Sequence, residues 1–347
     1  MANIAEILDC TIRDGSYAAH YYWKPEVLKK IITTLSECGI RYIEIGNGTG
    51  MGAYRTINGA LDDATYYANT IPYKGDAKIG SFFISNVGTE DDLKKFRDAG
   101  GDFVRVGCNA TETHTAVATI RVAKQLGFMV CCNLMKTYAI NRFELVHNVQ
   151  CIVEAGADYI YVVDSAGSML PEQVSEYMQA MHEFYPRTRL GFHGHNNLLL
   201  ANANSLQAAQ SGAQLIDATL CGLGRGAGNA QLESLAVIMQ KAGARTDGYD
   251  VWKLADLAQD VLSEIHNLKG STKREIIVGA AQFHDSNTAM LEQVAAQYSV
   301  DSNQLMVEVC KINIINPSRE LFEFAAQKLK EGQTVEHFAP RYYHKKM

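Results

Sequence analysis

Short β-like segments alternate with helix-like segments from residue 6 to about residue 242, and this repeat restricts the fold more than any other feature. The strand candidates cover residues 6–11, 41–46, 78–83, 102–107, 128–134, 158–164, 189–195 and 215–220. Helix-like stretches follow most of them, at residues 25–38, 90–99, 114–127, 142–155, 171–184, 202–211 and 230–242. An open sheet would leave two edges to be covered, whereas eight strand-and-helix units can close a circle. The sequence therefore predicts an α/β fold, a (β/α)8 barrel of the TIM type.

Two segments depart from the repeat. Residues 47–64 contain four Gly, so we expect a long loop there, close to a functional site. After about residue 245 the pattern becomes helical, with blocks at 250–268, 287–298, 302–311 and 317–330, the last expected to begin with Asn316 as its cap and Pro317 in its first turn. We predict a catalytic barrel domain over residues 1–245 and a small helical C-terminal domain over residues 246–347.

Composition and charge exclude several classes of protein. Hydrophobic residues make up 47% of the chain, which argues against disorder. Lys and Arg total 32 against 38 Asp and Glu, and no basic run is long enough to follow a phosphate backbone, so nucleic acid is not an expected partner. The chain has no apolar stretch of the roughly 18 residues that span a bilayer, and its first residues do not resemble a secretory signal. We expect no membrane association and a cytoplasmic location.

Polar residues gather where the predicted strands end, which is where barrels of this type carry their active sites. These candidates are Arg13, Asp14, Glu44, Arg105, Lys136, Asp164, Ser165, His193 and His195, followed by Arg225 and Asn229 in the loop at 222–233. Of these we expect Arg13, Arg105 and Ser165 to contact substrate.

His193 and His195 are the strongest indication of a metal site. Residues two apart on a strand project to the same side, so both imidazoles could bind one ion, although an H-x-H pair can also be a packed pair. Asp14 and Asn229 would add oxygen ligands, and this mixture suits an octahedral divalent ion with positions left for water or substrate. We expect Mn²⁺, with Mg²⁺, Co²⁺ and Zn²⁺ as alternatives, and we expect Glu44 to support a ligand from behind.

Two cationic residues have alternative interpretations. Arg13 could donate hydrogen bonds to a carboxylate or enolate oxygen, or it could form an ion pair at the barrel rim. Lys136 could form a Schiff base with a carbonyl substrate. A divalent ion would already accept the electrons of such a reaction, so we favour metal chemistry over the Schiff base.

Several motifs together resemble a known family. They are D-C-T-I-R-D-G at 9–15, D-S-A-G-S-M at 164–169, H-G-H-N-N-L at 193–198 and the segment 217–233. The chain resembles the metal-dependent DRE-TIM superfamily of aldolases and HMG-CoA-lyase-like enzymes, and within it the 4-hydroxy-2-oxovalerate aldolase branch. This resemblance implies that Asp14, His193 and His195 bind the metal, that Asn229 lies close by or also binds, and that Arg13 stabilises a pyruvate enolate. It also implies a helical C-terminal domain of the kind that meets a partner aldehyde dehydrogenase in that branch.

The chain departs from that branch at the general base. The aldolases have a His three residues after the motif's Asp, where this chain has Tyr17, and they have a Tyr where this chain has His284. A phenol with an ordinary pKa of about 10 is a poor base at neutral pH. We hypothesise that His284 or His20 supplies the base, and that Tyr17 donates a hydrogen bond.

The function expected from these residues is a divalent-metal-dependent pyruvate aldolase that cleaves a 4-hydroxy-2-oxo acid to pyruvate and an aldehyde, or runs the reverse. One alternative is an acyl-CoA-dependent Claisen synthase or HMG-CoA-lyase-like enzyme, and another is a non-catalytic barrel subunit that has lost its base. The expected partners are a small 2-oxo acid and an aldehyde. A homodimer is the default assembly, and an aldehyde dehydrogenase is the expected protein partner if one binds.

Overall fold

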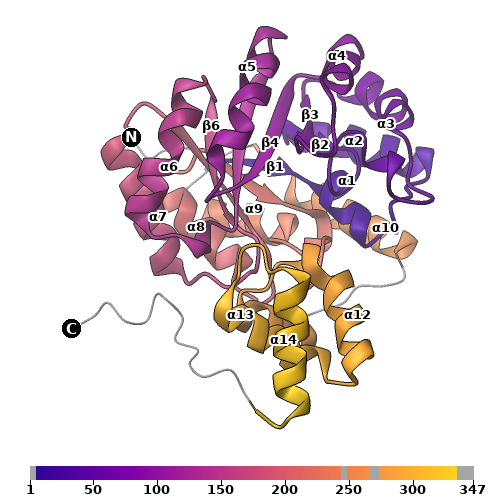
Figure 1. The fold of residues 1–347 in the computed structure, drawn as a ribbon. Coiled ribbons are helices and arrows are strands. Elements are labelled where there is room, and N and C mark those ends of the chain that lie inside the picture. Colours follow the sequence, from indigo (N-terminus) through magenta and orange to yellow (C-terminus); the bar gives the residue numbers. More distant parts are fainter. Residues whose placement is uncertain (1–4, 244–247, 266–272, 334–347) are drawn as a thin grey trace.

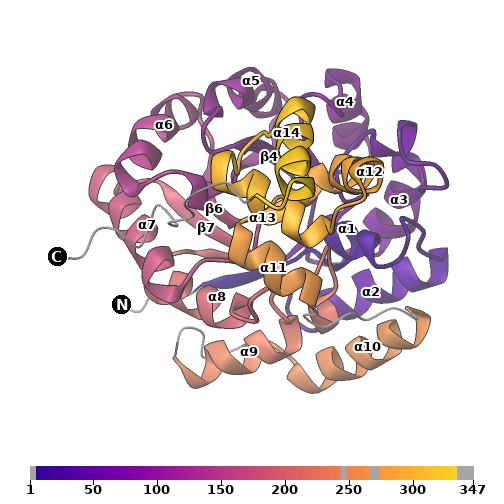
Figure 2. The same cartoon turned by 60° about the horizontal axis from the view of Figure 1, so that its bottom comes forward.

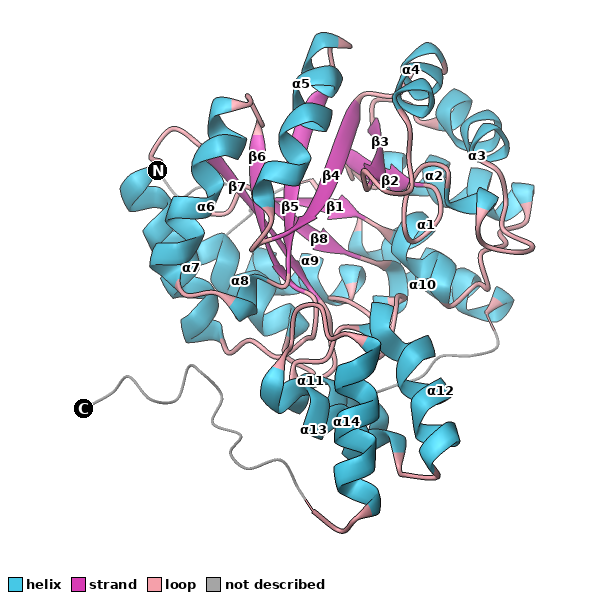
Figure 3. Cartoon of the chain, in the orientation of Figure 1, coloured by secondary structure: helices cyan, strands magenta, loops and turns pink. Residues whose placement is uncertain are grey.

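The barrel predicted from the alternating pattern is confirmed by the structure, a computed structural model that describes residues 5–243, 248–265 and 273–333 of the chain (Figure 1). Its strands close in chain order from β1 to β8, and every neighbouring pair is parallel (Figure 3). The strands are β1 Glu6–Asp9, β2 Tyr42–Ile45, β3 Lys78–Phe83, β4 Phe103–Asn109, β5 Met129–Met135, β6 Tyr159–Asp164, β7 Arg189–Gly194 and β8 Leu215–Ala218.

Helices surround the barrel and begin where the sequence supplies starting signals. Pro25 and Pro171 occupy the first turns of α2 and α7, while Thr89 and Asn141 form capping boxes at the starts of α4 and α6. The short α1 (Thr11–Asp14) follows β1 directly. The outer helices are α2 Pro25–Glu37, α3 Asp63–Thr70, α4 Glu90–Asp98, α5 Val117–Gln125, α6 Arg142–Glu154, α7 Pro171–Phe184, α8 Ala201–Gln210 and α9 Leu232–Lys241.

The strands bury both of their faces. Outward-facing side chains such as Ile43, Val104 and Cys132 pack with the helices in one large apolar core. Inward-facing side chains, including Leu8, Phe103, Cys131, Tyr161 and Leu215, form a second cluster that fills the barrel. The barrel is therefore a packed core, and its chemistry must lie at one of its ends.

Three features of the helices differ from the prediction. The loop expected over 47–64 is present as far as residue 62, apart from the 3-10 turn Ala53–Arg55, but α3 was not predicted and begins at Asp63, where Asp62 caps it by accepting from Thr65 N at 2.7 Å. The helix α11 (Lys273–Ala281) lies where no helix was predicted. The cap of α14 (Arg319–Lys330) is Ser318 and not Asn316, since the Ser318 hydroxyl accepts from Leu321 N.

The C-terminal helices have their own apolar core. Leu291 of α12 (Thr288–Tyr298), Val309 of α13 (Ser302–Ile312) and Phe322 of α14 are fully buried together. By contrast α10 (Val251–Glu264) contacts α2 and α9, and its apolar residues belong to the barrel core. The predicted boundary at 245/246 lies outside the described residues, as does the 266–268 end of the predicted helix 250–268. The helices that share this second core are α11 to α14, while α10 packs with the barrel.

The helices α11 to α14 lie across one end of the barrel (Figures 1 and 2). Contacts identify this as the end where the strands finish. Lys136, directly after β5, donates to the Ile315 carbonyl at 2.6 Å, and Arg225, in the loop after β8, pairs with Asp285 at 3.0 Å. The C-terminal helices therefore cover the predicted active end. Among the described helices, none combines the length and the apolar character needed to cross a membrane.

Candidate active site

Three predicted metal ligands come together at this end of the barrel. Asp14 follows β1, while His193 and His195 lie at the end of β7, and their potential ligand atoms all lie within 4.8 Å of one another. All three side chains are buried, and the Asp14 Oδ2 atom is 3.9 Å from His193 Nε2. A carboxylate and two imidazoles at this spacing could hold one divalent ion.

Neighbouring groups orient both imidazoles. His193 Nδ1 lies 2.8 Å from Asp217 Oδ2, and His195 Nδ1 lies 3.3 Å from the Gly228 carbonyl. Each acceptor favours a proton on Nδ1, which leaves Nε2 with a lone pair for a metal. Burial lowers the pKa of His195 to about 3, so its imidazole stays neutral. The ring orientations therefore fit metal binding.

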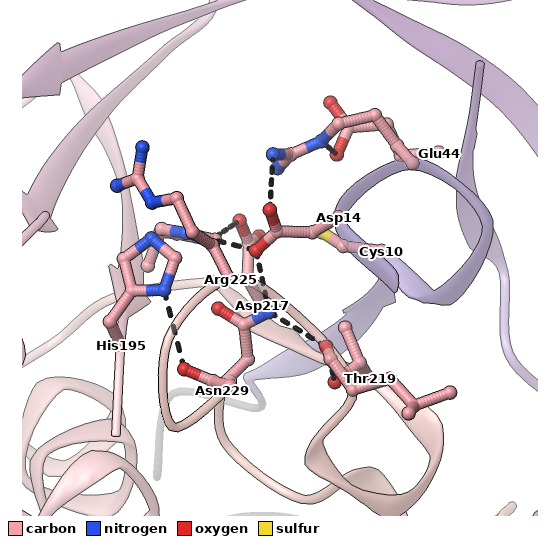
Figure 4. Close-up of polar contacts among 12 residues, drawn as sticks. Cys10, Asp14, Glu44, His195, Asp217, Thr219, Arg225 and Asn229 are labelled. Atoms are coloured by element: carbon pink, nitrogen blue, oxygen red, sulfur yellow. Dashed lines mark hydrogen bonds and ion pairs between the residues drawn. The ribbon is translucent and has the colours of Figure 1, made fainter. Parts of the chain in front are cut away.

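Asp14 is held by a cation and an amide. Its Oδ1 atom is 3.1 Å from an Arg13 nitrogen, and its Oδ2 atom accepts from Asn229 Nδ2 at 2.5 Å (Figure 4). Burial alone would raise the pKa of Asp14, but the Arg13 guanidinium lowers it well below its usual range, so the carboxylate is ionised. Asn229 Oδ1 is buried without a hydrogen-bond donor among the described residues. An amide oxygen and a carboxylate are the ligand types that a hard divalent ion prefers.

A buried ionic network supports the site from inside the barrel. Glu44 Oε2 accepts from Arg13 Nε at 2.8 Å and from Arg105 at 2.9 Å, and Arg105 also pairs with Asp217. Glu44 thus fixes Arg13 and Arg105 and not one of the three candidate ligands directly. The expectation that Arg105 binds substrate is corrected, because its side chain is fully buried and its guanidinium is paired inside the barrel.

Tyr17 and Arg225 form a second side of the site. The Arg225 guanidinium carbon is 5.9 Å from the centre of the Tyr17 ring. Burial raises the pKa of Tyr17 to about 12, so its hydroxyl is protonated and can donate a hydrogen bond but cannot act as a base near neutral pH. The Tyr17 ring also lies against Gly48, where a Cβ would come within 2.3 Å of it.

The two histidines proposed as the base differ in position. His20 is exposed, in a left-handed backbone conformation. His284 is buried, and its Nδ1 lies 2.7 Å from Ser286 Oγ. Burial, followed by the positive charges of Arg225 and Lys136, lowers the pKa of His284 well below 6.5, so its imidazole is neutral and close to the cations of the site.

Ser165 and Lys136 are joined by a hydrogen bond, since the Lys136 backbone N–H donates to Ser165 Oγ at 3.0 Å. The Lys136 side chain points to the C-terminal helices, where its Nζ contacts Ile315 O and Asn316 Oδ1. This ammonium therefore links the two parts of the chain, which does not favour the Schiff-base alternative.

Arg225 was predicted to lie near the site but had no predicted role, and Asp217 and Asp285 were not predicted as site residues. Asp217 sits inside β8, two residues after Leu215 and opposite the end of β7, so its alternation with the inward-facing Leu215 was the available signal. No local pattern pointed to Asp285, because it reaches the site only through the packing of the C-terminal helices.

The fold and this site define a (β/α)8 barrel with a carboxylate and two histidines arranged for a metal where its strands end. The chain belongs to the HMGL-like family, which matches residues 5–261. This confirms the superfamily resemblance drawn from the motifs.

The sequence is similar to named relatives along nearly its whole length. It is 31% identical to "4-hydroxy-2-oxovalerate aldolase 2" of Comamonas testosteroni, covering 95% of each chain. It is 32% identical to the "4-hydroxy-2-oxovalerate aldolase" of Moorella thermoacetica, covering 95% of this chain and 98% of the relative.

Solved structures show the same fold. The carboxyl transferase domain of Rhizobium etli pyruvate carboxylase superposes with a TM-score of 0.77 at 16% identity, over 96% of this chain and 61% of that one. The N-terminal domain of a Bacteroides vulgatus protein gives a TM-score of 0.70 at 24% identity, over 85% and 98% of the two chains. At these identities the likeness concerns architecture alone.

Proposed function

We propose that the protein is a divalent-metal-dependent pyruvate aldolase, a carbon–carbon lyase that reversibly cleaves a 4-hydroxy-2-oxo acid to pyruvate and an aldehyde. The observation that carries this proposal is the triad of Asp14, His193 and His195 with the Arg13 guanidinium 3.1 Å from Asp14. Near full-length similarity to relatives named 4-hydroxy-2-oxovalerate aldolase supports it.

The residues that would hold the metal are Asp14, His193 and His195, with Asn229 Oδ1 as a further oxygen ligand. Mn²⁺ remains the expected ion. When bound, a divalent ion supplies Lewis-acid polarisation of the 2-oxo group. The interior network keeps the protein ligands in place, since Asp217 fixes His193 and Glu44 fixes Arg13.

Arg13 would stabilise the negative charge that develops on the pyruvate half. Its Nε is bound by Glu44 and one terminal nitrogen by Asp14, while the other terminal nitrogen has no partner among the described residues. The side chain is 7% exposed, and the nearby carboxylates raise the pKa of Arg13 despite burial. A fixed, permanently charged donor in a buried site is the arrangement that stabilises an enolate oxygen. The Ser165 hydroxyl is the second candidate contact for substrate.

His284 is our candidate for the base that removes the 4-hydroxyl proton. His284 Nδ1 accepts from the Ser286 backbone N–H at 3.3 Å and lies 2.7 Å from Ser286 Oγ, so the role as base requires the tautomer in which Nδ1 carries the proton and donates it to Ser286 Oγ, which frees the Nε2 lone pair. The C3–C4 bond then breaks, its electrons pass to the 2-oxo oxygen, and the former hydroxyl oxygen becomes the aldehyde carbonyl. Protonation of the enolate at C3 yields pyruvate. Tyr17 would donate a hydrogen bond, and the exposed His20 is not part of this proposal.

The direct test is to supply 4-hydroxy-2-oxopentanoate with Mn²⁺ and to measure pyruvate release. We expect turnover that a chelator abolishes and that readded metal restores, and we expect Asp14→Asn to lose it. Turnover that continues unchanged in the presence of the chelator would contradict the proposed dependence on metal. Condensation that requires an acyl-CoA would favour the Claisen alternative, and stoichiometric metal without turnover on either substrate would favour a non-catalytic subunit. A homodimer, a dehydrogenase partner and a cytoplasmic location remain predictions.

A further inference from the structure

Arg225 brings to the site a positive charge that the proposed chemistry does not use. It comes from the glycine-rich loop after β8, and its side chain extends past His195 on the side of the site away from Glu44 (Figure 4). The side chain is only 20% exposed. Its charge acts on both Asp14 and His284, which lie on the metal side and the base side of the site.

The Arg225 guanidinium is held in place on one side and has hydrogen-bond donors left on the other. Asp285, at the start of the 3-10 turn Asp285–Asn287, forms an ion pair with Nε at 3.0 Å, and the Tyr17 ring lies beneath the guanidinium carbon. Both terminal nitrogens lack hydrogen-bond partners among the described residues. One pair of contacts fixes the orientation of the group, and the remaining N–H groups form the fork that binds a carboxylate or a phosphate with two parallel hydrogen bonds.

The two arginines lie where they would contact different halves of the substrate. Arg13 lies against Asp14 and Glu44, so it serves the half that becomes the enolate. Arg225 lies against Tyr17 and Asp285, and Asp285 directly follows the proposed base His284 in the sequence. Arg225 therefore faces the half of the substrate that becomes the aldehyde. Lys136 lies near Arg225 and adds to the positive field, while Asp285 offsets part of it.

We propose that Arg225 is a specificity-determining residue that selects aldehydes with an anionic group, a carboxylate or a phosphate, at the end away from the carbonyl. This inference rests on the proposed aldolase function and narrows its substrate class. The competing explanation is that Arg225 and Asp285 only fasten the C-terminal helices to the barrel.

The test compares acceptors in the condensation with pyruvate by the metal-loaded full-length protein. Succinic semialdehyde carries a carboxylate, glycolaldehyde phosphate carries a phosphate, and butanal is the neutral acceptor. We expect kcat/KM to be about 10- to 100-fold higher for at least one anionic acceptor than for butanal, since charged hydrogen bonds of this kind typically contribute that factor. The better of the two anionic acceptors distinguishes carboxylate from phosphate.

Three variants distinguish recognition of an anionic acceptor from a purely structural attachment of the C-terminal helices to the barrel. Arg225→Gln should remove most of the anionic preference, and Arg225→Lys should keep part of it because it retains charge but lacks the fork. Asp285→Asn breaks the same ion pair but keeps the guanidinium, so it should reduce the preference less than Arg225→Gln. Equal effects of R225Q and D285N on the ratio of anionic to neutral kcat/KM, or no preference in the unmodified protein, would overturn the inference.

Exchange of the pyruvate methyl protons, measured in deuterated water on the same proteins, tests the aldolase function separately from the role of Arg225. Exchange without an anionic preference would overturn the role of Arg225 alone. Absence of both exchange and condensation would overturn the aldolase function and this inference with it.

Discussion

The Nδ1 atom of His193 lies 2.8 Å from the Oδ2 atom of Asp217 on the neighbouring strand β8. Burial alone would raise the pKa of Asp217, but Arg105 and His193 lower it, so the carboxylate is ionised and only accepts hydrogen bonds. The proton of His193 is therefore held on Nδ1, and Nε2 is presented to the metal position.

Asp217→Asn should weaken metal binding about 10- to 100-fold, because the ring of His193 loses the carboxylate that fixes its tautomer. Calorimetric titration of Mn²⁺ into the metal-free protein measures this directly. Asp158→Asn is the matched control, since Asp158 precedes β6 and contacts Val130 N and Lys124 at the other end of the barrel. Unchanged affinity in D217N would show that Asp217 is only a partner of Arg105.

Gly224→Ala should also lower metal affinity, because the new Cβ would lie 2.2 Å from Asn229 Nδ2 and 3.3 Å from Asp14 Oδ2. Such overpacking typically costs about 1–3 kcal/mol and would here displace a ligand. The control is Gly59→Ala, whose Cβ would meet no atom within 4 Å and would incur only the roughly 1–2 kcal/mol cost of a left-handed residue. If both variants bind Mn²⁺ as the unmodified protein does, the packing between Asp14 and Asn229 is not needed.

His284→Ala should reduce kcat for aldol cleavage about 10²- to 10⁴-fold while metal content stays the same. Because the pKa of His284 is lowered well below 6.5, the base stays unprotonated at neutral pH, and kcat/KM should not fall from its protonation until the pH is well below 6.5. Ser286→Ala is the milder comparison, since it removes the hydroxyl contact at Nδ1 and keeps the contact of the Ser286 backbone N–H. Full turnover in H284A would exclude His284 as the base.

Lys136 should make stability depend on pH in the alkaline range. Burial lowers the pKa of Lys136 to about 8 from 10.5, so between these values the unfolded chain holds a proton that the folded chain has released. Stability then rises with pH, and the protein should gain about 3 kcal/mol relative to Lys136→Met between pH 8 and pH 10.5. Urea unfolding of both proteins at several pH values measures this difference. A constant difference would mean that Lys136 keeps an ordinary pKa in the folded chain.

The barrel and the metal ligands could be predicted because their signals are local. Strand periodicity gave each of the eight strands to within about two residues, and the spacing of His193 and His195 placed both on one side of β7. The short helix α3 was missed because Gly-rich residues precede it, although its capping Asp62 was a usable signal.

The contacts between distant segments could not be predicted. Whether Arg105 points into the barrel core or toward substrate depends on Glu44 and Asp217, which lie on other strands. The side on which α10 packs depends on α2 and α9, not on its own pattern. The approach of Asp285 to Arg225 follows only from the placement of the C-terminal helices over the barrel. These features are tertiary contacts, and such contacts produce no periodic pattern in the sequence.

The central claim is that this site makes a pyruvate enolate. The most direct measurement is loss of the methyl-proton NMR signal of pyruvate in deuterated water, with Mn²⁺-loaded protein, chelated protein and D14N in parallel, each passed over a column to remove free metal before assay. We expect exchange with the loaded protein and none with the other two. Exchange that persists after chelation or in D14N would contradict the claim that the metal site makes the enolate. Absence of exchange with the loaded protein, both with pyruvate alone and with an aldehyde present, would also contradict it.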